Sequence, residues 1–174
     1  MSQERLETLI SREEIQEKVQ EMARQISEEY RGQEVFFICV LKGAVVFLAD
    51  LMRFMKVPVE IDFMAVSSYG KSTVTSGIVR ILKDLETSIE NRNVIIVEDI
   101  VDTGLTLSYL MENLASRNPA SLKICTLLDK VDCRRVEVTP DYRGFIIPDK
   151  FVVGYGLDCG EKYRNLADVC VLHR

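Results

Sequence analysis

Acids, hydroxyl groups and a glycine lie close together near the middle of the chain. Glu98 and Asp99 follow four β-branched apolar residues at 94–97, and Asp102-Thr103-Gly104-Leu105-Thr106 leads into a helical pattern. A turn of this kind lets backbone N–H groups converge on an anion at a helix N-terminus, which indicates a phosphate site. Carboxylates repel a nearby phosphate unless they bind another group. The two hydroxyls of a ribose, or a Mg²⁺ ion, could be that group. We therefore predict that the chain binds a sugar phosphate.

An ordinary acidic turn at the end of a strand is the alternative interpretation, and for a single acid it would be the better one. Four β-branched apolar residues in a row are typical of a strand buried on both faces of a parallel sheet. Two adjacent acids, a third acid and a Thr-Gly-x-Thr turn at the carboxyl end of such a strand favour the ligand site, because open α/β sheets bind ligands there.

The size and composition of the chain suit one soluble globular domain. Of its 174 residues, 47% are hydrophobic and 28% charged, so we predict a single domain over 1–174. The net charge of −5 argues against broad binding to nucleic acid or membrane surfaces. The five cysteines are odd in number and lack CxxC spacing, which indicates neither a disulfide framework nor a zinc site and favours a cytoplasmic location. Lys42, Gly43 and Asp50 interrupt the most apolar window, so we predict no membrane span.

Hydrophobic spacing predicts alternating helices and strands. Ser11-Arg12-Glu13-Glu14 has the pattern of a helix capping box, and apolar residues recur at helical spacing as far as Tyr30. Further along we predict strands over 35–41, 59–66, 78–82, 94–101 and 122–128, helices over 44–55 and 105–116, and short β-like runs over 144–147, 151–154 and 169–172. This alternation predicts an α/β fold with a mostly parallel sheet flanked by helices. We expect a core at roughly 35–130 and a small hood subdomain from the N-terminal segment and roughly 131–174.

Residues 67–77 are polar, contain two glycines and have little to bury, which predicts a mobile loop. A plain connector between strands is one interpretation of this loop. A lid is the other, because a sugar transfer that passes through an oxocarbenium-like state must exclude water, and a polar loop that closes over the site does so.

Several blocks of the chain resemble one enzyme family. The run from Glu98 to Gly104 resembles the phosphoribosyl pyrophosphate (PRPP) signature of type I phosphoribosyltransferases. Leu41-Lys42-Gly43, Ser68-Tyr69-Gly70, Asp129-Lys130 and the run 148–158 recur in the same order in hypoxanthine-guanine phosphoribosyltransferases, and the ending at 159–166 is similar to their bacterial branch. The resemblance covers roughly 35–172. It implies the type I phosphoribosyltransferase fold and a purine salvage reaction, the Mg²⁺-dependent transfer of 5-phosphoribose from PRPP to N9 of hypoxanthine or guanine.

The resemblance also implies which residues bind PRPP. Ribose hydroxyls are assigned to Glu98 and Asp99, and the 5′-phosphate is assigned to Asp102, Thr103, Gly104, Leu105 and Thr106. Pyrophosphate is assigned to Lys42, Gly43, Ser68, Tyr69 and Arg164, and Mg²⁺ to Glu98, Asp99 and Asp158. Leu105 departs from relatives that carry a lysine at this position, so phosphate binding here would rest on backbone N–H groups and hydroxyls.

A second set of residues is implied for the purine: Lys130, Phe151, Val152 and Asp158. Lys130 would donate to the 6-oxo group, Phe151 would stack on the base, and Asp102 would act as general base or proton acceptor at N7. Taken alone, Lys130 and Phe151 would be a surface charge and a core side chain. Arg134 and Glu161 match family positions whose roles the resemblance leaves open.

Two other kinds of protein could use the same PRPP-binding turn. A PRPP-sensing regulator that binds RNA or DNA should show a clustered basic face or an added DNA-binding segment, and this acidic chain shows neither. A phosphoribosyltransferase for xanthine, adenine or a pyrimidine is the other alternative. Lys130 and Phe151 favour a 6-oxopurine over adenine or a pyrimidine, but they do not distinguish hypoxanthine, guanine and xanthine. The expected partners are thus PRPP and 6-oxopurine bases, without nucleic acid or membrane, in a homodimer or homotetramer as the family suggests.

Overall fold

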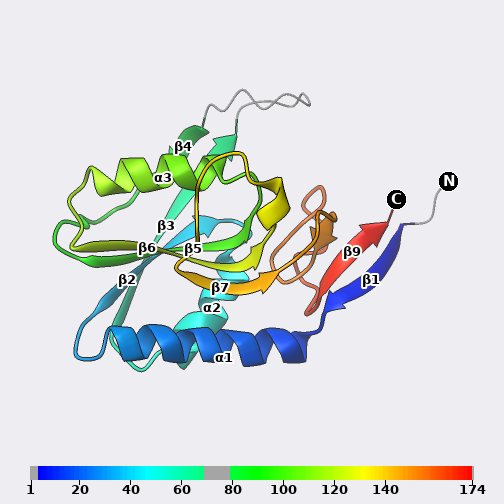
Figure 1. The fold of residues 1–174 in the computed structure, drawn as a ribbon, viewed down its shortest axis with the longest axis horizontal. Helices are drawn as coiled ribbons and strands as arrows, with labels where there is room; N and C mark the ends of the chain where they lie inside the picture. Colours follow the sequence, from blue (N-terminus) through cyan, green and yellow to red (C-terminus); the bar gives the residue numbers. More distant parts are fainter. Residues whose placement is uncertain (1–3, 69–78, 174) are drawn as a thin grey trace.

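A computed structural model describes residues 4–68 and 79–173 of the chain (Figure 1). The predicted loop at 67–77, with Tyr69, lies outside the described residues from position 69 onward. The described helices are α1 (Arg12–Glu29), α2 (Val45–Phe54) and α3 (Leu105–Ala115), with a 3₁₀ turn, η1, at Val131–Cys133. The described strands are β1 (Arg5–Ile10), β2 (Val35–Leu41), β3 (Val59–Ser68), β4 (Val79–Lys83), β5 (Asn93–Val101), β6 (Ser121–Asp129), β7 (Tyr142–Ile146), β8 (Val152–Val153) and β9 (Val169–His173).

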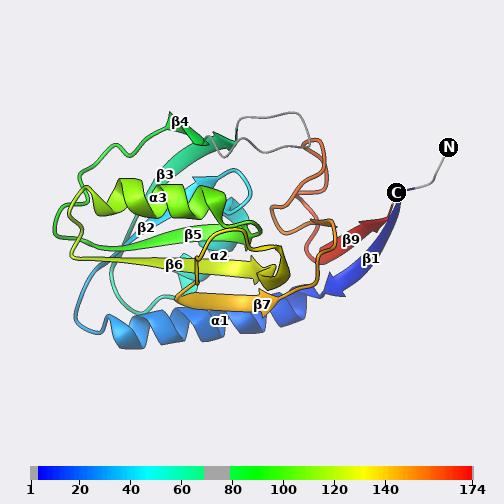
Figure 2. The ribbon, with the colours of Figure 1, turned by 45° about the horizontal axis from the view of Figure 1, so that its top comes forward.

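The larger sheet confirms the predicted α/β fold class. Its strand order is β4-β3-β2-β5-β6-β7, and every neighbouring pair is parallel except β3 and β4. Helices α1 and α2 cover one face of the sheet and α3 covers the other (Figures 1 and 2). Because alternate residues of a strand point to opposite faces, Phe37 packs in the cluster with α1 and α2 whereas Phe36 packs in the cluster with α3. The central strands are thus buried on both faces, as their apolar sequences predicted.

The carboxyl ends of β2 and β5 form a switch point in this sheet. The two strands are neighbours, with Cys39 of β2 beside Val97 of β5. The chain continues from β2 into α2 on one face and from β5 into α3 on the other. Open parallel sheets bind ligands at such points. The residues that follow β2 and β5 therefore lie where the sequence predicted a ligand site.

Helix α1 begins at the predicted capping box. The Ser11 hydroxyl accepts a hydrogen bond from the Glu14 N–H at 3.3 Å, and the Glu14 carboxylate accepts one from the Ser11 N–H at 2.8 Å. Ile15, Val19 and Met22 then recur on the buried face of the helix. Within the described ranges, no helix is both long enough and apolar enough to cross a membrane.

The two ends of the chain meet in a second sheet of three antiparallel strands, in the order β1-β9-β8. Arg5 of β1 pairs with His173 of β9, and the two strands lie side by side in Figures 1 and 2. The sequence did not predict β1, because most of its side chains are exposed and show no apolar alternation. Strand β1 forms because β9 supplies its backbone partners.

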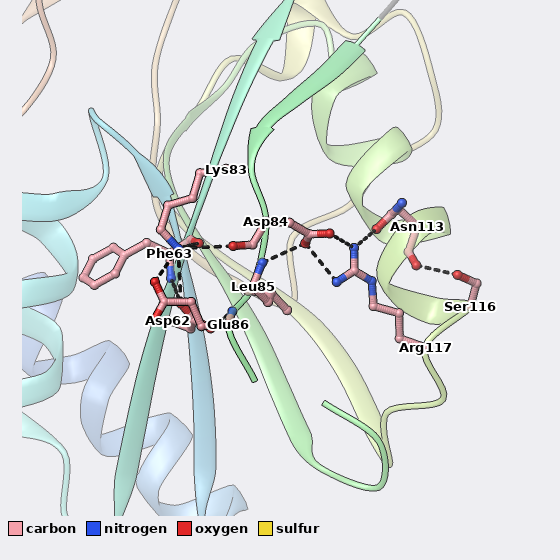
Figure 3. A network of polar contacts seen from close by, with 9 residues as sticks. All are labelled: Asp62, Phe63, Lys83, Asp84, Leu85, Glu86, Asn113, Ser116 and Arg117. Carbon is pink, nitrogen blue, oxygen red and sulfur yellow. Dashed lines mark hydrogen bonds and ion pairs between the residues drawn. The ribbon is translucent and has the colours of Figure 1, made fainter. Parts of the chain in front are cut away.

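A polar network fastens the hairpin of β3 and β4 to the body of the protein (Figure 3). The Asp62 carboxylate accepts hydrogen bonds from the N–H groups of Phe63 at 2.7 Å and Glu86 at 2.8 Å. Burial raises the pKa of Asp62, but these hydrogen bonds outweigh it and hold the pKa below its ordinary value. Asp84 pairs with Arg117, just beyond α3, at 2.9 Å. The hairpin is therefore anchored at the end that is remote from the switch point.

Candidate active site

A cavity of about 170 Å³ opens at the carboxyl ends of β2, β3 and β5. Its walls come from Val40, Val66 and the segment that runs from β5 into α3. Most of the residues predicted to bind ribose and 5′-phosphate line this cavity: Glu98, Asp102, Thr103, Gly104 and Thr106.

The loop between β5 and α3 has the geometry of an anion cradle. Gly104 caps α3 with a φ of 82°, in the left-handed region that favours glycine. The first N–H groups of a helix have no acceptor within the helix, and they carry the positive end of its dipole. The Leu105 N–H donates to the Thr103 hydroxyl over a long 3.4 Å. The first turn of α3 therefore presents backbone donors to an anion.

Glu98 and Asp99 are crowded carboxylates on β5. Burial and the neighbouring charge of Asp99 raise the pKa of Glu98 well above its ordinary value, and burial also raises the pKa of Asp99. A diol or a Mg²⁺ ion between them would relieve this cost, so the pair fits either ligand. Among the described residues, no group of three His, Cys, Asp or Glu side chains forms a metal cluster. In this part of the chain, Glu98, Asp99 and Asp158 do not form one cluster of three carboxylates, and their assignment to Mg²⁺ stays a prediction.

Replacing Glu98 with Gln is expected to stabilise the unliganded protein. Because the folded pKa of Glu98 is raised, its contribution to stability is full below the pKa of an unfolded Glu and is lost as the pH rises through the raised value. Each gain of about 1 kcal/mol would raise the Tm by roughly 2–4 °C in a chain of this size. Thermal unfolding at about pH 5 and about pH 8 checks this, with the larger gain expected at the higher pH. Glu17→Gln, at an exposed position of α1, is the control, and an unchanged Tm of Glu98→Gln at the higher pH would contradict the prediction.

Strand register places Lys130 beside Asp102. Val101, the last residue of β5, pairs with Asp129, the last residue of β6, so Asp102 and Lys130 follow the two strands at the same edge of the sheet. The Lys130 N–H donates to the Val101 carbonyl at 2.9 Å. The Lys130 ammonium lies 3.9 Å from the Asp102 carboxylate and 3.4 Å from that of Asp149. Lys130 is buried, whereas 54% of the Asp102 side chain is exposed. A hydrogen-bond donor and a proton acceptor thus lie together beside the cradle.

The loop after β2 packs tightly between two other parts of the site. The peptide bond between Leu41 and Lys42 is cis. A Cβ added to Gly43 would fall 1.7 Å from Oδ2 of Asp99, and a Cβ added to Gly156 would fall 2.2 Å from the Gly43 carbonyl oxygen. The loop therefore lies against the β5 acids on one side and the turn at 154–157 on the other.

Both cationic side chains that were predicted to bind pyrophosphate form ion pairs with carboxylates of the protein. The Lys42 ammonium lies 3.0 Å from Glu161, and the Arg164 guanidinium lies 3.0 Å from Asp158 and 3.4 Å from Glu161. The hydrogen bond from Lys42 and its charge lower the pKa of Glu161, which is therefore ionised at neutral pH. Burial raises the pKa of Asp99 overall, and the positive charge of Arg164 partly opposes that rise.

Phe151 is an exposed aromatic residue that closely follows a residue in contact with Lys130. Phe151 is 51% exposed as a residue, while Val152 is buried in the pairing of β8 with β9. The Phe151 carbonyl accepts a hydrogen bond from the Leu172 N–H at 3.0 Å, and Asp149, two residues earlier, contacts Lys130. Phe151 is thus not a buried core side chain, and an exposed ring in this place suits stacking on a base.

Three contacts of the site were not predicted. Glu161 pairs with Lys42, Asp149 pairs with Lys130, and the Arg134 guanidinium donates to the Asp102 carbonyl at 2.8 Å. Sequence spacing could not reveal them, because each depends on how the carboxyl ends of different strands align. The side chains of Ser68 and Tyr69 lie outside the described part of the structure, so their assignment to pyrophosphate stays a prediction.

Known proteins match the chain over nearly its whole length. The model of the phosphoribosyl transferase domain matches residues 10–159. A hypoxanthine-guanine phosphoribosyltransferase of Mycobacterium tuberculosis is 54% identical over 170 residues, which cover 94% of this chain and 84% of that protein. The protein of the same name from Bacillus subtilis is 54% identical over 164 residues, which cover 94% and 91%.

Solved structures share the fold as well. The crystal structure of a hypoxanthine-guanine phosphoribosyltransferase from Bacillus anthracis matches with a TM-score of 0.91 at 53% identity, covering 95% of this chain and 97% of that one. A hypoxanthine phosphoribosyltransferase from Staphylococcus aureus matches with a TM-score of 0.93 at 45% identity, covering 96% and 91%. Since identity of this level extends across the sheet, the cradle and the lysine beside it, the chain belongs to the hypoxanthine-guanine phosphoribosyltransferases.

Proposed function

We propose that this chain is a purine salvage enzyme that transfers 5-phosphoribose from PRPP to N9 of hypoxanthine or guanine, with Mg²⁺, and releases pyrophosphate. The observation that carries the proposal is the 3.9 Å approach of the Lys130 ammonium to the Asp102 carboxylate beside the cradle. A donor for a 6-oxo group and an acceptor for an N7 proton are then available to one purine ring.

The proposed chemistry assigns a separate task to each group. As N9 bonds to C1 of the ribose, the bond from C1 to the pyrophosphate oxygen breaks and the N7 proton passes to Asp102. Phe151 and Lys130 hold the base, while the first turn of α3 holds the 5′-phosphate. Lys42 and Arg164 exchange their carboxylate partners for pyrophosphate oxygens, for which a guanidinium fork is well suited. Glu98, Asp99 and Asp158 are the carboxylates proposed to hold Mg²⁺, which when bound neutralises charge on the leaving pyrophosphate.

The direct test is nucleotide formation by the purified protein with PRPP, Mg²⁺ and one base at a time: hypoxanthine, guanine, xanthine, adenine or uracil. We expect nucleotide from hypoxanthine or guanine and none without Mg²⁺. No nucleotide from either base, or turnover of uracil alone, would contradict the proposal.

Base choice is expected to depend on Lys130. An ammonium group donates hydrogen bonds and cannot accept them, so it favours a 6-oxo group and rejects the 6-amino group of adenine. Lys130→Gln can donate or accept, and we expect it to reduce the ratio of hypoxanthine to adenine use, measured as kcat/KM for each base. Lys150→Gln, an exposed lysine near Phe151 in sequence, is the matched control and should leave the ratio unchanged. Equal use of adenine and hypoxanthine by the wild-type protein would contradict the assignment of Lys130.

A homodimer or homotetramer and a cytoplasmic location also stay predictions. Light scattering of the purified protein tests the first, and cell fractionation tests the second.

A further inference from the structure

Three consecutive carbonyl groups, one at the end of β5 and two in the loop that leads to α3, are held by one other segment of the chain. The Val101 carbonyl accepts a hydrogen bond from the Lys130 N–H at 2.9 Å, and the Thr103 carbonyl accepts one from the Arg135 N–H at 2.9 Å. Between them, the Asp102 carbonyl accepts a hydrogen bond from Nη1 of Arg134 at 2.8 Å. The segment 130–135, which includes η1, therefore binds one side of the loop along its length.

This arrangement fixes the direction of the N–H groups in the same loop. In a trans peptide the C=O and the N–H point in opposite directions, so a carbonyl held toward 130–135 turns the next N–H away from that segment. The N–H groups concerned belong to Asp102, Thr103 and Gly104, and all three residues line the cavity. The carbonyl contacts thus direct successive N–H donors toward the side where an anion would bind.

Arg134 is the one side chain among these three donors, and it is itself firmly held. Its Nη2 contacts the carboxylate of Asp129, which is fully buried at the end of β6. Its Cδ lies 3.0 Å from the point where a Cβ on Gly104 would fall, so the stem of Arg134 packs beneath the cap of α3. The second oxygen of Asp129 is 3.3 Å from Nη1 of Arg143, which contacts Asp129 without reaching the loop.

We propose that Arg134 is a positioning residue that presets the backbone N–H groups of the cradle for the 5′-phosphate of the substrate. The inference rests on the proposed function, because it takes the cradle to be the 5′-phosphate site. The Arg134 guanidinium presents one nitrogen to the Asp102 carbonyl and another to the Asp129 carboxylate, and the single nitrogen of a lysine cannot reproduce this spaced, planar geometry. Donors that are already oriented need no rearrangement when the phosphate arrives.

The test compares ligands that differ only in the 5′-phosphate. Calorimetry would measure the affinity of the full chain for inosine 5′-monophosphate and for inosine, in wild type, Arg134→Gln and Arg143→Gln. We expect Arg134→Gln to weaken the monophosphate about tenfold or more, as when a hydrogen bond to a charged group is lost, and to leave inosine affinity unchanged. Arg143→Gln, the matched control at the same buried carboxylate, should bind both ligands as wild type does.

A second variant tests whether the expected loss of affinity in Arg134→Gln comes from a general loss of folding. Arg134→Lys keeps a cation beside the buried Asp129 and should melt near the wild-type temperature, yet it should also lose monophosphate affinity. The inhibition constant of pyrophosphate, which does not use the cradle, should stay unchanged in both Arg134 variants.

The possible outcomes separate the inference from the proposed function. Equal weakening of inosine and its monophosphate, or wild-type monophosphate affinity in Arg134→Lys, would overturn the role of Arg134 while leaving the proposed function intact. Wild-type protein that binds inosine and its monophosphate equally, or that forms no nucleotide, would instead overturn the proposed function.

Discussion

Replacing Asp102 with Asn is expected to slow phosphoribosyl transfer by about 10²–10⁴-fold, the usual contribution of a general base. An amide keeps the shape of the side chain but cannot take the purine proton. The backbone of the loop should stay in place, because its carbonyl at this residue is held by Arg134 at 2.8 Å rather than by the carboxylate. Nucleotide affinity should therefore change little.

Single-turnover measurements are the right test of this variant, because product release can limit kcat and hide a slower chemical step. Asp149→Asn is the matched control, since Asp149 also lies beside the Lys130 ammonium, at 3.4 Å. We expect the control to retain most of its single-turnover rate. A rate for Asp102→Asn equal to that of wild type would rule out Asp102 as the proton acceptor.

Gly43→Ala is expected to reduce kcat/KM by about 10²-fold or more, the loss that follows from a misplacement of roughly 1 Å in a catalytic site. The new methyl group would fall 1.7 Å from Oδ2 and 2.7 Å from Cγ of Asp99, so the carboxylate must move. Asp99 is one of the two acids proposed to bind ribose hydroxyls and Mg²⁺. The substitution thus displaces the acid without removing it.

Two comparisons separate this effect from a loss of stability. Gly32→Ala should lower the Tm, because Gly32 has a φ of +78°. It should keep transfer activity, because no atom beyond its own chain neighbours lies within 4 Å of the added Cβ. The double variant Gly43→Ala, Asp99→Ala should regain Tm relative to Gly43→Ala and remain inactive. Transfer by Gly43→Ala within a few-fold of wild type would mean that the position of Asp99 against Gly43 is not needed.

Sequence patterns predicted the elements whose residues are buried in a regular way. Strand β2 has the predicted bounds, Val35–Leu41, because nearly all of its side chains are buried and the run ends at a lysine and a glycine. Helix α1 was predicted from a capping box and one apolar face, both of which are local features. The ligand-binding turn after 94–97 was likewise predicted from the sequence, since the spacing of its acids and its glycine already indicates a turn before a helix.

Features that depend on distant strands could not be read from the sequence. Strand β1 carries mostly exposed side chains, and its partner β9 lies at the opposite end of the described chain. The pairing of Lys42 with Glu161 joins two exposed residues 119 positions apart. Arg134 reaches the Asp102 carbonyl only because β5 and β6 align Val101 with Asp129, and no periodicity encodes that alignment.

The pairing of β1 with β9 sets the order in which a newly synthesised chain can complete its site. Arg5 of β1 pairs with His173 of β9, so β1 has no strand partner until β9 has left the ribosome. Strand β8 pairs with the other edge of β9, and the Phe151 carbonyl is held by the Leu172 N–H. The surface proposed to receive the base is therefore completed only after β9 has emerged, later than the segment that forms the phosphate cradle.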